Sequence, residues 1–264
     1  MNIFIHEIKA NFKSLVIWSA IIGLLILIAV SKFSAFAGDP ETLKILDTMP
    51  KPLLDAFNMQ AFNLTTVSGF YGLMFVYFTI MGAIAAAMWG SGIISKEERD
   101  KTVEFSLVLP VSRNRVVTAK ALAALVNCIA MVLITWGISI VAVQSYAPDG
   151  KFYSFLVMEM IAMFIIEMIF LAVGLLLGCA MKQFKRSGSL AVAIILVTYF
   201  MYVLIGMEND FDFLKYFTPF KYFDAVALFN TGRMEPLYLA LSAVIVVGCV
   251  AGAYWTYNRR DLYI

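Results

Sequence analysis

Two glutamates, Glu159 and Glu167, lie inside one long apolar run that extends from Phe155 to Met181. An ionisable side chain left unpaired in hydrocarbon costs several kcal/mol, so it is by default a candidate for a functional role. At about 100° per residue, eight residues of separation place the two carboxyls within roughly 80° of each other around a helix. The spacing therefore predicts that both face one polar cavity or a subunit interface.

The two glutamates are expected to have different roles. Glu159 follows closely on the start of the run, so we expect it near the outer membrane interface, where its carboxyl can reach water. Glu167 is expected at greater depth, either as a structural hydrogen-bonding group or as a proton relay. A proton-coupled secondary transporter with Glu167 as its proton carrier is therefore an alternative function.

The sequence offers little for catalysis or metal binding. Its one histidine, His6, has no second ligand at metal-site spacing, and its three cysteines each stand inside an apolar run. This pattern argues against a zinc site and against a disulfide framework. We find no paired nucleophile and base, and no Gly-x-x-x-x-Gly-Lys-Ser/Thr phosphate loop. We therefore expect no enzyme, and neither a metal nor a cofactor bound to this chain.

The composition indicates that lipid is the solvent for most of the chain. Hydrophobic residues make up 62% and charged residues 14%, with a mean hydropathy of +0.86. A soluble domain has about 45–50% apolar residues and about 25% charged residues. A helix needs about 20 apolar residues to cross a bilayer. Runs of about that length occupy residues 15–36, 70–94, 119–146, 155–181, 190–207 and 237–257. We predict an all-α membrane protein in which residues 1–264 form one domain with six transmembrane helices.

The distribution of basic residues predicts that both termini are cytoplasmic. An even number of spans puts both termini on one side, and 13 of the 20 Lys and Arg residues then fall on that side. Lys and Arg are retained in cytoplasmic loops, whereas Asp and Glu have little influence. The alternative of a signal-peptidase site at Ala35-Phe36-Ala37 is disfavoured, because the preceding apolar run exceeds the usual length of about 7 to 15 residues.

Two flanking segments have the pattern of helices that lie along a membrane surface. In residues 1–14, Phe4, Ile8 and Phe12 recur at helical spacing, with basic residues on another face. This pattern predicts an interfacial helix on the inner surface, which either binds a partner or only anchors the first span. Residues 208–236 are strongly aromatic and predict interfacial or partly re-entrant helices on the outer side.

The inner segment 95–118 contains helix start and stop signals that a simple connector does not need. Ser95 and Glu98 form a capping box, which predicts a helix that begins at Lys96, and Pro110 would end it. Charges gather in the first two turns of this helix, and an apolar face follows. Such a helix can dock into a groove on a cytoplasmic partner, or it can lie against the bilayer between two basic clusters.

The same segment resembles the inner loop of ABC type-2 exporter permeases. The order and spacing agree at Glu98, Thr102, Glu104, Leu107, Pro110, Arg113 and Lys120. Two residues depart from the family pattern. Lys101 stands where the family often has Gly before the Thr, and Ser106 stands in place of one of the two leucines. The start of the chain is similar to the family's connecting helix, with Glu7, Lys9 and Trp18, and residues 218–223 resemble its outer gate segment. The resemblance thus covers nearly the whole chain.

The resemblance implies a transmembrane subunit that works with other chains. It implies a second permease, either another copy or a paralogue, and cytoplasmic ABC ATPase subunits that hold the ATP and Mg. It also implies a multi-pass protein of a bacterial plasma membrane. The ATPase-coupling residues it implies are Glu97, Glu98, Thr102, Glu104, Phe105, Leu107, Pro110 and Arg113, and the outer gate residues are Phe217, Pro219 and Phe220.

Composition and resemblance also bear on what the protein binds. A net charge of +2 with no dominant basic block argues against nucleic acid. With no outer domain and no polysaccharide-sized polar groove in evidence, we expect a small amphipathic or hydrophobic cargo. The compact members of the family suggest exported amphipathic peptides such as toxins or bacteriocins, followed by hydrophobic drugs. Glu159 and Glu167 would then line the translocation pathway or a subunit interface.

Overall fold

The computed structural model describes most of the chain. The described residues are 3–34, 48, 50, 51, 54, 59, 62–99, 112–146, 148, 150–181, 184–207 and 209–259, and side chains are not described at 93–99, 184–185 and 209. The predicted coupling residues Thr102, Glu104, Phe105, Leu107 and Pro110 therefore lie outside the described residues. Glu97 and Glu98 are placed only by their backbone.

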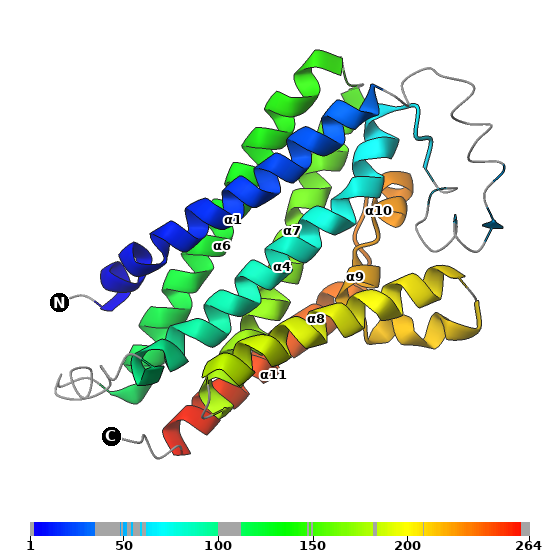
Figure 1. The fold of residues 1–264 in the computed structure, drawn as a ribbon. Coiled ribbons are helices and arrows are strands. Elements are labelled where there is room, and N and C mark those ends of the chain that lie inside the picture. The colour runs from blue at the N-terminus through cyan, green and yellow to red at the C-terminus, as the bar shows by residue number, and fades with distance from the viewer. Residues whose placement is uncertain are drawn as a thin grey trace.

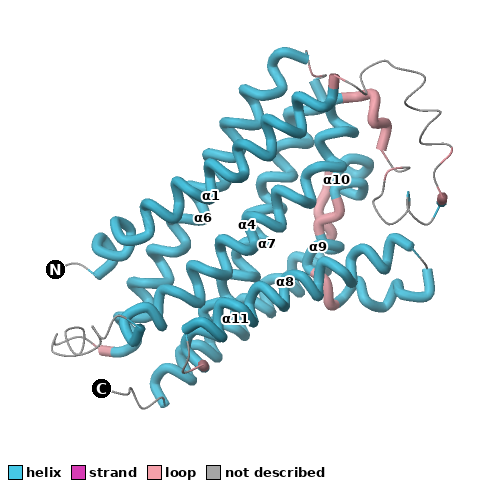
Figure 2. Tube along the Cα trace, in the orientation of Figure 1, coloured by secondary structure: helices cyan, strands magenta, loops and turns pink. Residues whose placement is uncertain are grey.

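The described chain is helical apart from short connections, as Figure 2 shows. Six helices of the described residues are long and apolar enough to cross a membrane, so the prediction of an all-α protein with six candidate spans is confirmed. The long helices are α1 (Ile3–Phe33), α4 (Val67–Arg99), α6 (Arg113–Val143), α7 (Gly150–Ala180), α8 (Phe184–Met207) and α11 (Pro236–Arg259). Shorter ones are η1 (Gln144–Tyr146), η2 (Asn209–Tyr216), α9 (Pro219–Tyr222) and α10 (Ala225–Thr231).

Helices α4 and α7 form the centre of the bundle. They make the most extensive helix contact in the structure, while α1 packs on α6, and α8 and α11 pack against α4 and α7 respectively. Figure 1 shows this order, with α1 and α6 on one side of the pair and α8 and α11 on the other. Because α8 and α11 bury little of their apolar surface within the chain, lipid or another subunit must cover the rest.

Small residues allow α4 and α7 to approach closely. A Cβ atom added at Gly174 would lie 2.3 Å from the carbonyl oxygen of Ala87, and one added at Gly90 would lie 2.4 Å from that of Leu171. A Cβ at Gly178 would meet the carbonyl of Ser91 at 2.7 Å. The small-residue spacing of Gly174 and Gly178 thus has the packing role that such steps have in membrane helices.

Helix α1 begins and α11 ends at the same end of the bundle (Figure 1). Helix α6 also begins there, since Lys120 contacts Glu7 of α1. We call this end the termini end. The opposite end carries η2, α9 and α10, which connect α8 to α11.

Two helix boundaries differ from the sequence-based expectation. Residues 3–14 continue into the first span as the single helix α1, since neither Gly nor Pro interrupts them. The prediction of a helix that begins at Lys96 is wrong, because α4 runs through Ser95 to Arg99. Extending a helix adds one hydrogen bond per residue, whereas a new helix needs a costly nucleus, and Lys, Glu and Arg are good helix formers.

The close contact between α4 and α7 makes a prediction about Gly174. Gly174→Ala should destabilise the bundle by about 1–3 kcal/mol, because the added methyl must push the α4 backbone away. Gly137→Ala is the matched control, since a Cβ there meets nothing within 4 Å. Thermal unfolding in detergent should show a lower Tm for the first variant and an unchanged or higher Tm for the second. Equal Tm values would contradict the packing described here.

Candidate functional site

The first turns of α6 lie within the predicted coupling segment 95–118 and are held from several directions. Ser112 caps the helix, with its hydroxyl accepting a hydrogen bond from the Arg115 amide at 3.4 Å. A capped start fixes the direction in which the chain enters the helix. We call the contacts that α6 makes here with α1 and α11 the α6 junction.

A buried ion pair forms one side of the α6 junction. Lys120 Nζ lies 3.1 Å from Glu7 Oε1, and the side chains are only 1% and 7% exposed. Lipid provides no water to solvate a lone charge, so each of these groups needs a partner inside the protein. The pair therefore fixes α6 against the first turns of α1.

The other side of the α6 junction is a set of hydrogen bonds to α11. Arg113 donates to the carbonyl oxygens of Tyr257 and Asn258, at 3.3 and 3.4 Å. The amide of Asn258 donates to the Asn114 side chain at 2.8 Å. The hydroxyls of Thr118 and Tyr254 lie 2.6 Å apart. Arg113 thus satisfies carbonyls at the end of α11 that have no partner within that helix, and its positive charge suits the negative end of the helix dipole.

Helix α4 is also tied to α1 near the termini end. Trp89 of α4 donates its indole N–H to the Ser14 hydroxyl at 3.0 Å. Helix α4 leads into residues 100–111, and α6 leads out of them. Both helices that flank the predicted coupling segment are therefore attached to α1.

The structure places both α7 glutamates in the interior of the bundle. Glu159 and Glu167 are fully buried by this chain's own helices, so the expectation that Glu159 reaches the outer interface is wrong. The reason is the helix start, because α7 begins at Gly150 and Glu159 lies about 13 Å along it. Neither carboxyl has a hydrogen-bond partner in the part of the chain that the structure describes, and neither lies on a surface that a second subunit could contact.

The predicted outer gate residues divide into one exposed and two buried side chains. Phe217 is 66% exposed, whereas Phe220 is 3% exposed and Pro219 is buried. The Phe220 ring lies 5.7 Å from that of Phe170 in α7 and 6.1 Å from that of Tyr199 in α8. The Phe220 ring therefore fills the space between these two helices.

Polar contacts hold this segment in place. The buried Thr218 hydroxyl donates to the carbonyl of Thr198 at 2.7 Å, and the Tyr222 hydroxyl donates to the carbonyl of Tyr216 at 2.5 Å. Burial raises the pKa of the Tyr222 phenol, so it remains a neutral donor at physiological pH. The segment is thus attached to α8 and closed on itself.

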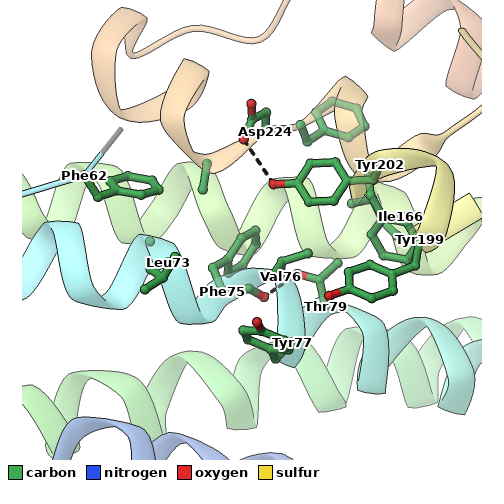
Figure 3. A pocket seen from close by; sticks show the side chains of 14 residues that line it. Phe62, Leu73, Phe75, Val76, Tyr77, Thr79, Ile166, Tyr199, Tyr202 and Asp224 are labelled. Carbon is green, nitrogen blue, oxygen red and sulfur yellow. Dashed lines mark hydrogen bonds between the residues drawn. The ribbon is translucent and has the colours of Figure 1, made fainter. Parts of the chain in front are cut away.

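Asp224 is the centre of a further polar cluster at the same end. Its carboxylate lies 2.7 Å from Lys221 Nζ, accepts from the Tyr202 hydroxyl at 3.5 Å and caps α10 at the Val226 amide. Figure 3 shows Asp224 and Tyr202 at the edge of a small cavity. The cavity has a volume of about 30 Å³, which is room for a water molecule.

Sequence reasoning missed several of these contacts. Glu7 and Lys120 were recognised as family positions but not as partners, since nothing in a sequence says which membrane helices lie side by side. Asp224 did carry a signal, because an Asp immediately before a short apolar helix is typical of an N-cap. The hydrogen bond between Tyr71 and Ser139, at 2.6 Å, had no such signal.

The described residues include six candidate spans, with α4 and α7 at their centre and charged groups held inside. These features define a multi-pass membrane protein. The family described as ABC-2 family transporter protein matches residues 1–262, nearly the whole length. The chain therefore belongs to the ABC-2 transporter family, as its membrane permease. The permease itself lacks ATPase activity, and ABC-2 permeases generally pair with ABC ATPase subunits. No individual curated protein matches the sequence.

The buried ion pair generates a stability prediction. Lys120→Met leaves the Glu7 carboxylate buried without this partner, and Glu7→Leu does the same to Lys120, so each should destabilise the protein by about 3–5 kcal/mol. The double variant should recover most of that loss, since no buried charge remains at either position. Thermal unfolding of the four proteins would measure this cycle.

A matched control is the more exposed pair of Lys215 and Asp212, whose side chains are 28% and 58% exposed. Lys215→Met should leave the Tm nearly unchanged, because exposed ion pairs contribute little to stability. If the double variant of Glu7 and Lys120 is less stable than both single variants, the two residues do not act as a pair.

Proposed function

We propose that this chain is the transmembrane subunit of an ATP-driven exporter. Two permeases, either copies of this chain or this chain and a paralogue, form the translocation pathway. Separate ATPases bind the coupling segment within residues 95–118, and the termini end faces the cytoplasm of a bacterial cell. The observation that carries this proposal is the α6 junction, which lies at the end of that segment and connects α6 to both terminal helices.

The α6 junction supports a specific path for the mechanical signal. ATP binding that closes the ATPases favours one arrangement of the permease over the other, and the coupling segment communicates this preference. A displacement of α6 at Arg113 would be passed to α11 through its hydrogen bonds, and one at Lys120 to α1 through the buried ion pair, which resists separation. The helices of the termini end would then move as a unit.

The segment around Phe220 is proposed as the outer gate. In the described conformation Phe220 fills the space between α7 and α8, and Asp224 and Thr218 anchor its backbone. Withdrawal of one aromatic side chain would open the space without breaking a long helix. Phe217 and Pro219 would direct the chain at its entry to α9.

The proposed cargo is an amphipathic peptide, such as a secreted toxin or bacteriocin, with hydrophobic drugs as the second class. An apolar cavity of about 200 Å³ supports a cargo with apolar groups. It lies between α6, α7 and α11, near Leu125, Leu171 and Val250, and Thr118 and Tyr254 line it at the termini end. Apolar walls with few polar groups are typical of sites that accept varied hydrophobic ligands.

The coupling role predicts the effect of Glu98→Ala and Glu104→Ala. Each should reduce cargo-stimulated ATP hydrolysis by the reconstituted complex by roughly 5- to 150-fold, the usual range of allosteric coupling. Glu235→Ala is the control, because Glu235 is exposed at the opposite end. An ABC ATPase should copurify with the wild-type chain.

Two results would contradict the exporter assignment of this chain. One is transport by the purified chain alone, without nucleotide and driven by a pH gradient, with loss on Glu167→Gln; this is what a proton-coupled secondary transporter would show. The other is labelling of Lys101 by a membrane-impermeant amine reagent from outside the cell.

The cargo proposal has its own test. Amphipathic cytolytic peptides should stimulate ATP hydrolysis by the reconstituted complex, and Val250→Trp, which fills part of the apolar cavity, should weaken that stimulation. Val247→Trp is the matched control, since Val247 is 67% exposed on the same helix. Hydrolysis that responds to hydrophobic drugs but is indifferent to such peptides would replace the first cargo class with the second.

A further inference from the structure

Helix α7 carries two buried carboxyls in a setting quite unlike that of Glu7. Glu7 is held at 3.1 Å from a lysine, whereas all four carboxyl oxygens of Glu159 and Glu167 are buried with no hydrogen-bond partner among the described residues. Neither residue takes part in an ion pair among the described residues. A charge in such a place would have no cationic partner among the described residues.

Glu167 packs closely against α4. A Cβ atom added at Gly82 of α4 would lie 2.7 Å from Glu167 Oε1 and 2.6 Å from the terminal methyl of Met163. The carboxyl therefore packs directly against the α4 backbone. From α6, the Cys128 thiol is the titratable group that acts on it, and no cation does so among the described residues.

The neighbours of Glu159 are polar but uncharged. Tyr71 of α4 is its titratable neighbour, and the Tyr71 hydroxyl lies 2.6 Å from that of Ser139 in α6. Ser139 in turn donates to the carbonyl of Thr135. Here too, no cationic side chain of the described residues acts on the carboxyl.

Burial of an ionised carboxylate without a partner is so costly that the group takes up a proton instead. We propose that Glu159 and Glu167 are two proton-binding sites, each occupied by a proton in the packed arrangement of α4, α6 and α7. A protonated carboxyl is neutral and carries an O–H donor, so it can be accommodated where a carboxylate cannot.

A row of polar groups on α6 matches the spacing of the two sites. The Asn127 amide nitrogen and the Thr135 hydroxyl are buried without partners and lie eight residues apart, as do the two glutamates. Because α6 and α7 run in opposite directions, Asn127 and Cys128 stand at the level of Glu167, and Thr135 and Ser139 at that of Glu159. The row and the carboxyls therefore cover the same depth of about 12 Å.

Proton occupancy links the packing of the helices to pH. If α4 and α7 separate, water reaches the carboxyls and they release their protons, so the packed arrangement binds more protons than the separated one. A rise in pH then favours separation, and a fall in pH favours packing. The role of this equilibrium in transport rests on the proposed function, whereas the proton occupancy itself does not.

Infrared spectroscopy of the full chain in an ester-free detergent tests the occupancy directly. At pH 7 the wild-type protein should show the carbonyl band of protonated carboxyls. Glu159→Gln and Glu167→Gln should each remove part of that band, since an amide replaces a neutral carboxyl with little change in shape. Glu235→Gln, at an exposed position, should leave the band unchanged.

A pH series on the same proteins gives a second, independent readout. The wild-type Tm should fall as the pH rises from 6 to 9, because the folded state holds protons that the unfolded chain releases. The double glutamine variant should lose this part of the decline, and Glu235→Gln should retain it.

The infrared measurement decides the proposal. If the wild type lacks the carbonyl band at pH 7, or if both single variants retain that band in full, the proposal is overturned. Neither result requires an ATPase, so the proposed exporter function would be unaffected.

Discussion

A charge among membrane helices must find its partner within the protein, and the arrangement of the termini end follows from that constraint. Lys120 satisfies it with Glu7, which fixes the start of α6 against α1. Arg113 satisfies it differently, by donating to two carbonyls at the end of α11. One short stretch of α6 thereby holds the first and the last helix of the chain. This stretch includes the end of the predicted coupling segment.

The bundle combines a tightly packed centre with outer helices that bury little of their apolar surface within the chain. Helices α4 and α7 meet at glycines, where carbonyl groups stand in place of side chains. Helices α8 and α11 leave most of their apolar surface uncovered. In a permease that works with a second subunit, such surfaces are where another chain or lipid must pack. The polar contacts of α11 at the α6 junction add to its packing against α7.

The six spans could be predicted from sequence because each depends on a property of a single segment, its apolar length. Helix boundaries were predicted less well than the helices themselves, since Ser95 has the pattern of a helix start and yet lies within α4. The depth of Glu159 was misjudged for the same reason, because α7 begins five residues before the apolar run.

The contacts of the site depend on which helices are neighbours. The family motif identified Lys120 and Arg113 as important, and the connecting-helix pattern identified Glu7. Their partners became evident only when α1, α6 and α11 were placed side by side. The buried carboxyl of Glu167 was expected, but its contact with the Gly82 backbone is a property of the α4–α7 packing.

The most direct test of the coupling role is a charge reversal at the buried ion pair, measured in the complex reconstituted with its ATPase subunits. The quantity to measure is the ratio of ATP hydrolysed with cargo to that without it. Glu7→Lys or Lys120→Glu alone should abolish the response to cargo, and the two together should restore it. If the double reversal responds no better than either single variant, or if the single variants respond as the wild type does, the α6 junction does not couple the ATPase to the bundle.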